Sequence, residues 1–436
     1  MTFFGAIDSA LVPTTPTTFD LGNSPETPKC GIGLFGDQAT FGTENSDYKM
    51  SMGMTDGTND KCIVVNSANG VSPMQADRVQ LDNAVCQRTP TGGGVSQTIT
   101  HNSFLSDGWR LNLANPNATQ KRFTGIMFGG SDLVNFEVGK VAFTNTPGAG
   151  EQTFSFADSG LNPNVMFFIT AGTNVAGGVS DFALVCLGVA IKPEDTIIQR
   201  NINLRVDEDG ATTSNPAATV RNDRVSGQAT ASTISIQWGA QLTKLIVGEF
   251  GLTPSIAAAS GDEIIYLAME ITNQNIGLES ITMPTGTGTF SVTSFGFQPS
   301  FSFSVFSMLQ SFNTVVGDAS SGVLSIGVGN DSGDNICNAW RSADARNPSF
   351  NGSVVENTFI YCPYEDQTFI APGSNATNGF ESDSLTFIGD GWEVNMIATN
   401  TLTRVAWSLA IGPKNNKFFR ENLRAGFQPV HGRFQL

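Results

Sequence analysis

The sequence predicts an all-β protein made of three tandem β-sandwich domains, of jelly-roll or Greek-key type, followed by a C-terminal tail. Charged residues make up only 14% of the 436 residues, whereas Gly (47) and Phe (32) are abundant. This composition is typical of short, tightly turned strands, and long runs of helix-forming residues at helical spacing do not occur. A motif that recurs twice more, each time after about 140 residues, sets the number of domains.

The recurring motif is a tight turn followed by a strand. Its three copies align without gaps and cover Phe104–Leu113, Leu245–Pro254 and Phe387–Met396. Asp-Gly precedes Trp109 and Trp392, and Phe250 stands at the same position in the second copy. Apolar residues then follow at every second position, which predicts that one face of the strand is buried. Trp109, Phe250 and Trp392 are therefore the predicted core residues of the repeat.

Two further segments recur at matching positions. A second apolar strand follows each motif and carries Ile126 and Phe128, Leu267 and Met269, or Leu409 and Ile411. In the front half, Gly160–Pro163 and Gly296–Pro299 each precede an apolar strand, and the first copy has only Pro28 there. The longest apolar run, Phe182–Ile191, predicts a strand that is buried on both faces.

These matches divide the chain into repeat 1 at residues 1–137, repeat 2 at 138–277 and repeat 3 at 278–412, with a tail at 413–436. Repeats of this length are each expected to fold around a core of their own.

The tail differs from the repeats in composition. It contains five basic residues against one acid, Glu421, although the whole chain has a net charge of −16. A basic, aromatic arm on an acidic body suits docking onto a neighbouring protein, and folding back onto the chain's own acidic domains fits equally well. The predicted docking residues are Lys414, Lys417, Phe418, Phe419, Arg420, Arg424, Phe427, Arg433 and Phe434. Gly426–Pro429 repeats the residues of Gly296–Pro299, a weak sign of a truncated fourth copy.

The sequence offers no catalytic constellation, and we expect no enzyme, cofactor or metal. Only two histidines occur, His101 and His431, and we interpret His101 as an ordinary loop residue. The candidate acids for glycoside hydrolysis are Asp107, Glu249, Asp390 and Glu393, and all but Glu393 sit at the turn position that recurs with the motif. A turn residue kept by geometry explains them better than a catalytic pair. Oxygen-rich loops at Asp56 and Asp60, at Asp207–Gly210 and at Asn330–Asn335 lack the full spacing of a calcium loop.

The cysteines recur in part. Cys62 and Cys86 match Cys337 and Cys362, and both a disulfide and two facing buried thiols fit this pattern. The start of the chain lacks the pattern of a signal peptide, which favours reduced thiols. Cys30 and Cys186 lie in apolar strands and are interpreted as small core residues.

Some aromatic residues lie in segments that could face a ligand. Trp340, Tyr361 and Tyr364 lie in polar segments and are the better candidates for contact with a sugar. The acidic chain disfavours binding to nucleic acid and to anionic membranes.

The assembled pattern resembles a repeat of virion structural proteins from tailed bacteriophages. In the third copy it runs through Gly286–Gly288, Gly296–Pro299, Ser325–Gly327, Asp390–Trp392 and Leu409–Gly412, and the resemblance covers residues 12–412. The second copy departs from it, because Gly248-Glu249-Phe250 replaces Asp-Gly-Trp and the cysteine pair is missing.

The resemblance implies a capsid decoration or cement protein on the outer head surface, assembled in the host cytoplasm. Its partners would be the major capsid protein, other virion proteins or further copies of itself. Three linked copies are also expected to mimic a trimer around a three-fold position. The alternatives are a receptor-binding tail or vertex adhesin that contacts glycans and a carbohydrate-binding protein unrelated to viruses.

Overall fold

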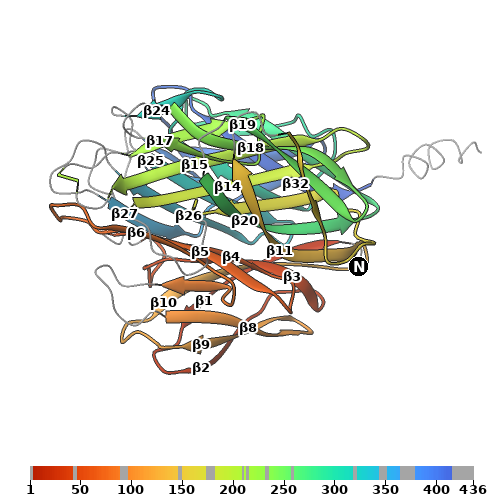
Figure 1. The fold of residues 1–436 in the computed structure, drawn as a ribbon, viewed down its shortest axis with the longest axis horizontal. Coiled ribbons are helices and arrows are strands. Elements are labelled where there is room, and N and C mark those ends of the chain that lie inside the picture. Colours follow the sequence, from red (N-terminus) through yellow and green to blue (C-terminus); the bar gives the residue numbers. More distant parts are fainter. Residues whose placement is uncertain are drawn as a thin grey trace, which may run out of the picture.

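The computed structural model describes residues 3–42, 47–88, 97–145, 150–172, 182–208, 211–212, 216–230, 235–256, 260–317, 322–342, 351–363 and 379–414. Every regular element in these ranges is a β-strand, and the strands pair antiparallel. They form three β-sandwich units, so the predicted fold class is confirmed. Figure 1 shows the strands of the first unit, in red and orange, beneath those of the other two.

Unit 1 pairs a six-stranded sheet, in the order β1-β10-β3-β4-β5-β6, with a four-stranded sheet, β2-β9-β8-β7. Its strands are β1 (Phe4–Val12), β2 (Thr17–Leu21), β3 (Pro28–Phe35), β4 (Tyr48–Thr55), β5 (Asp60–Ser67), β6 (Ala76–Leu81), β7 (Cys86–Arg88), β8 (Gln97–Leu105), β9 (Gly108–Ala114) and β10 (Lys121–Gly129). The first strand thus pairs with the last and the second with the one before it, which is how a jelly roll winds. The third to sixth strands form a meander.

Unit 2 has the same order, β11-β20-β13-β14-β15-β16 and β12-β19-β18-β17. Its strands are β11 (Leu133–Asn145), β12 (Gln152–Ser155), β13 (Val165–Thr170), β14 (Phe182–Ile191), β15 (Ile198–Glu208), β16 (Ala217–Arg221), β17 (Ser226–Thr230), β18 (Ser235–Ile246), β19 (Glu249–Ile256) and β20 (Ser260–Ile271). The described side chains of β14, from residue 183 onward, are all buried, as its unbroken apolar sequence predicts.

Unit 3 repeats the order once more, β21-β32-β23-β25-β26-β27 and β22-β31-β29-β28. Its strands are β21 (Gln274–Thr282), β22 (Gly288–Val292), β23 (Phe301–Phe306), β24 (Val315–Gly317), β25 (Gly322–Asn330), β26 (Asn335–Ser342), β27 (Asn351–Glu356), β28 (Tyr361–Cys362), β29 (Phe380–Ser382), β30 (Thr386–Ile388), β31 (Gly391–Ala398) and β32 (Val405–Pro413). The strand β30 pairs with β31, and β24 leaves its own unit to pair with β16 of unit 2.

The unit borders differ slightly from the borders read from the sequence. The sequence borders at 137/138 and 277/278 lie inside β11 and β21, and both strands pair within the unit that follows. The physical transitions lie at residues 130–132 and 272–273, between β10 and β11 and between β20 and β21. A repeated motif gives the length of the repeat, but it does not show which strand comes first in each unit.

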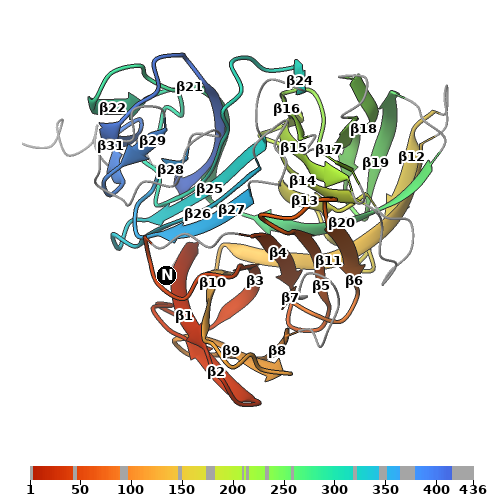
Figure 2. The same cartoon turned by 90° about the vertical axis from the view of Figure 1, so that its left-hand side faces the viewer.

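The three large sheets face one another around a common centre, as Figure 2 shows. Besides a core inside each sandwich, the chain has one larger core to which all three units contribute. Phe128 of unit 1 lies 6.2 Å from Phe167 of unit 2 and 5.4 Å from Phe301 of unit 3, measured between ring centroids. Strands such as β4 and β25 are consequently buried on both faces.

The units interlock in a cyclic order. The first strand of each unit packs on the preceding unit, since β1 contacts β25, β11 contacts β5 and β21 contacts β14. The connection after each third strand also reaches the sixth strand of the preceding unit. Gly42 N donates to Val355 O of β27 at 3.0 Å, Arg78 of β6 donates to Ala171 O, and β24 pairs with β16. The three contacts run in the same direction around the ring, as the contacts of a head-to-tail trimer do. They also cover sheet edges that would otherwise be open.

Candidate functional site

The aromatic residues that define the repeat occupy equivalent places in the three sandwiches. Trp109, Phe250 and Trp392 are each 0% exposed and belong to the inner cores of units 1, 2 and 3. Each pairs across a hairpin with the aromatic or aliphatic residue that opens the motif, namely Phe104, Leu245 or Phe387. Their burial indicates that they shape the sandwich interior.

His101 is not a loop residue, as the sequence had suggested, but part of β8. Its Nδ1 accepts a hydrogen bond from the indole N–H of Trp109 at 3.0 Å, and its ring lies 4.6 Å from that of Phe104. Burial lowers the pKa of this half-buried imidazole. The spacing of eight residues across a hairpin brings the two side chains together, a relationship that residue type alone does not reveal.

The four candidate acids are distributed over the three units. Asp107, Glu249 and Asp390 stand at the equivalent hairpin turns of three different units, and Asp107 and Asp390 are exposed. Glu249 forms an ion pair with Lys244, and Glu393 accepts a hydrogen bond from the hydroxyl of Ser291 at 2.7 Å. The three turn acids are therefore divided among three units, and only Asp390 and Glu393 belong to the same one.

In two of the oxygen-rich loops, side-chain oxygens accept hydrogen bonds from backbone N–H groups of the same loop. Asp56 Oδ1 accepts hydrogen bonds from the backbone N–H groups of Thr58 and Asn59, and Asn330 Oδ1 does the same for Ser332 and Asp334. The carboxylate side chains of Asp207–Gly210 lie outside the described residues. In the described ranges, no group of three or more His, Cys, Asp or Glu side chains is placed to hold a metal ion.

All six cysteines are buried free thiols. Burial raises the pKa of the thiols of Cys186 and Cys337 to about 12, and it also raises those of Cys30, Cys62 and Cys86. Of the two arrangements that fitted the sequence, the structure holds buried thiols and not disulfides. Thiols with raised pKa values are poor nucleophiles and read as core residues.

Two of the three aromatic residues expected to contact sugars, Trp340 and Tyr361, are buried. Trp340 is 1% exposed, and its indole N–H donates to Lys49 O of unit 1 at 3.0 Å. Tyr361 is 7% exposed, and Tyr364 lies outside the described residues. The interpretation of Trp340 as a ligand-contacting residue is wrong, because its polar neighbours belong to a strand that another unit covers.

One end of the ring gathers the connections between units, and we call it the linker end. Asp132, between units 1 and 2, accepts hydrogen bonds from Thr272 N and Gln274 Nε2, each at 2.7 Å. Lys414 N donates to Asn273 O at 3.2 Å, and its side chain is exposed. Of the predicted docking residues only Lys414 is described, and the others lie outside the described residues, namely Lys417, Phe418, Phe419, Arg420, Arg424, Phe427, Arg433 and Phe434.

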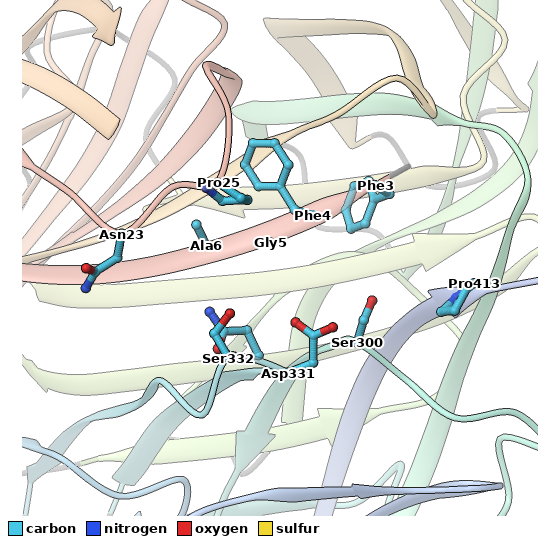
Figure 3. Close-up of a pocket in the computed structure, with 11 residues that line it drawn as sticks. Phe3, Phe4, Gly5, Ala6, Asn23, Pro25, Ser300, Asp331, Ser332 and Pro413 are labelled. Carbon is cyan, nitrogen blue, oxygen red and sulfur yellow. Dashed lines mark hydrogen bonds between the residues drawn. The ribbon is translucent and has the colours of Figure 1, made fainter. Parts of the chain in front are cut away.

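A cavity of about 210 Å³ opens near this end, between unit 1 and unit 3, and we call it the seam pocket. Phe4 and Pro25 of unit 1 lie on one side, and Ser300 and Asp331 of unit 3 lie across from them (Figure 3). The remaining lining residues are Phe3, Gly5, Ala6, Asn23, Asn330, Ser332 and Pro413. Burial raises the pKa of the Asp331 carboxyl at the rim. The pocket is smaller than the ~300–1,000 Å³ that small-molecule sites usually offer.

Sequence reasoning did not find the seam pocket, although a signal for it existed. The first copy lacks the Gly-Leu/Phe-x-Pro segment that precedes the third strand of the other two copies. A missing buried residue at an otherwise repeated position is the expected sign of a cavity.

Within the described part of the chain, no helix is long and apolar enough to cross a membrane. The fold and its geometry define a class, a single-chain ring of three interlocked β-sandwiches. Comparison of the chain with protein-family models, curated proteins and solved structures finds no match.

Proposed function

We propose that this protein is a structural component of a tailed phage virion, a decoration or cement protein that binds the outer surface of the head. The observation that carries the proposal is the pseudo-three-fold ring. Three sandwiches interlocked in cyclic order present three similar surfaces around one axis, as a homotrimer does. A single chain of this shape suits a three-fold or quasi-three-fold position of a shell.

Charge and chemistry agree with a structural role. The chain is strongly acidic, with a net charge of −16, and so stays soluble on a particle surface without attracting nucleic acid. Two side chains that could support catalysis have partners within the chain, since His101 accepts a hydrogen bond from Trp109 and Glu393 accepts one from Ser291. The partner in this proposal is the major capsid protein or another virion protein.

Quantitative protein composition of purified particles tests the proposal. A decoration protein is expected in many copies, in the ratio of one chain to three shell subunits if each ring covers one three-fold position. A ratio of three chains to three subunits would contradict the role of the ring as a built-in trimer. Absence from the particles would contradict the virion role altogether, and a handful of copies would favour the alternative of a tail or vertex adhesin.

Binding to shells offers a second measurement. Purified full-length protein is added to particles from a strain that lacks it, and thermal release of the particle contents is followed. A cement protein is expected to raise the release temperature and to saturate at the same ratio of one to three.

A further inference from the structure

The seam pocket occupies one of three equivalent places, and the other two are filled. The strand register makes Ala6, Glu137 and Gly277 equivalent, because each pairs with the residue before Phe128, Met269 or Ile411 on the last strand of its unit. In each unit this position lies at the edge strand of the large sheet. The three side chains differ greatly in size, so the space beside them must be filled in three different ways.

Unit 3 fills the space with aromatic rings. A Cβ atom placed on Gly277 would lie 2.6 Å from the ring of Phe295 and 3.4 Å from that of Phe297. Phe297 belongs to Gly296–Pro299, is 7% exposed and packs edge-on against Phe295 at 6.0 Å. The Gly-Phe-Gln-Pro segment thus acts as a plug for its own sandwich.

Unit 2 fills the space with Glu137. Its carboxylate accepts a hydrogen bond from the hydroxyl of Tyr266 at 2.6 Å and from Asp158 N at 3.1 Å. Leu161, in the segment that corresponds to Gly296–Pro299, is 0% exposed.

Unit 1 has neither solution. Ala6 contributes one methyl group, and the residues that precede Pro28 are Pro25, Glu26 and Thr27, none of which is buried. Phe4, which is 7% exposed and belongs to the inner core of unit 1, covers part of this place over Gly129, and the seam pocket lined by Phe4, Ala6 and Pro25 remains beside it. Its volume of about 210 Å³ suits a single large side chain.

We propose that Phe427 of the chain's own C-terminal arm fills the seam pocket and serves as the plug of unit 1. Phe427 belongs to Gly426–Pro429, which has the same four residues as the plug of unit 3. The arm leaves the described structure after Lys414, next to Pro413, which lines the pocket. The 13 residues that follow Lys414, up to and including Phe427, span up to roughly 40 Å when extended, which is ample for the chain to turn back.

Charge favours the same occupant. Asp331 stands at the rim of the pocket, and Arg424 precedes Phe427 by three residues in a basic arm. A guanidinium group beside a partly desolvated carboxylate is a favourable contact. The assignment decides between the two roles that the composition of the arm predicted, and it is independent of the virion proposal.

Limited trypsin digestion of the full-length protein tests the assignment through the rate of cleavage after Arg424. Phe427→Ala is expected to speed this cleavage by about tenfold or more, because truncating a buried aromatic residue shifts a docking equilibrium by more than that. Phe434→Ala changes an aromatic residue of the same arm outside the plug and is expected to leave the rate unchanged. Equal rates for the native protein and Phe427→Ala would overturn the assignment.

A variant of the pocket tests the other partner. Ala6→Leu places a side chain in the cavity and is expected to speed cleavage as Phe427→Ala does, with the melting temperature of the body showing that it still folds. Native-like protection in a folded Ala6→Leu protein would contradict the proposed site. Protection is also expected to be independent of protein concentration. Loss of protection on dilution would show that the arm of a second copy occupies the pocket, and the own-chain assignment would then be wrong.

Discussion

The indole N–H of Trp109 donates a hydrogen bond to Nδ1 of His101 at 3.0 Å, so the buried core residue of the first repeat depends on a neutral imidazole. A protonated imidazole has no lone pair with which to accept this bond. In the other units a tryptophan indole N–H has an acceptor that does not titrate. Trp238 donates to Gln228 Oε1 at 3.0 Å, and Trp392 donates to Ser408 Oγ at 3.3 Å. Unit 1 is therefore the sandwich whose core carries a pH-dependent contact of this kind.

This contact predicts a specific loss of stability in mild acid. Burial lowers the pKa of His101 in the folded state, so the unfolded chain takes up the proton first and stability falls as the pH drops through the unfolded value near 6.5. His101→Gln keeps an acceptor without a titration, and its melting temperature is expected to fall less than that of the native protein between pH 7.5 and pH 5. Parallel melting curves for the two proteins would show that the imidazole does not contribute.

The shared core predicts that the three sandwiches unfold together. Phe128, Phe167 and Phe301 come from three units, and Phe128 contacts the other two in the common core. Calorimetry is expected to show one transition, and Phe128→Ala should lower it as a whole at a cost of about 3–5 kcal/mol. Leu402→Ala, at a side chain that is 48% exposed, is the control and should have little effect. Three separate transitions, or a shift in one of several, would contradict a common core.

The sequence predicted the small sheets better than the large ones. In β9, the buried residues Trp109, Leu111 and Leu113 alternate with Arg110 and Asn112, which are partly exposed, so that period two reveals the strand and its inner face. The repeat spacing then carried this assignment into the other two units. Local alternation is sufficient there because one face of each small sheet meets solvent.

The sequence pattern did not show that the large sheets are buried on both faces. In β26, Asn338 lies two residues before Trp340, on the same face of the strand, and is itself buried at 2% exposure. A polar residue at such a position looks like part of a solvent-facing edge, but this face of the strand meets the neighbouring unit, which supplies Lys49 O to Trp340. Contacts between units depend on how complete sandwiches dock, and the periodicity of one strand contains no information about that docking.

A glycine at one equivalent position of each unit predicts a sharp steric effect. A Cβ atom on Gly53, Gly188 or Gly327 would lie 1.8, 1.8 or 2.0 Å from the backbone oxygen of Val85, Val225 or Phe359, where the chain enters the small sheet. Gly188→Ala is expected to cost about 3 kcal/mol or more, because the obstructing atom is backbone and cannot rotate away. Gly286→Ala, which would meet no atom within 4 Å, serves as the control in urea unfolding. Equal stability of the two variants would mean that the crossing chain can move aside.

Two buried acids of unit 3 give the clearest pH dependence. Glu356 is 4% exposed and Glu381 is 7% exposed, and burial, together with the charge of Glu381, raises the pKa of Glu356 to about 8. The folded state therefore holds a proton that the unfolded chain releases near pH 4.5, so stability is greatest below that pH and declines as the pH rises toward 8.

Glu356→Gln removes this penalty, because an amide occupies the same space without ionising. At pH 9 the variant is expected to be more stable than the native protein by roughly 2–4 kcal/mol, since each unit of pKa shift corresponds to about 1.4 kcal/mol. The difference should shrink toward zero below pH 4.5, where both states of the native protein hold the proton. Urea unfolding at the two pH values measures it, and Glu194→Gln, at an exposed glutamate, controls for the change in net charge. A Glu356→Gln protein that is less stable than the native one at pH 9 would show that the carboxylate is ionised and stabilising in the fold.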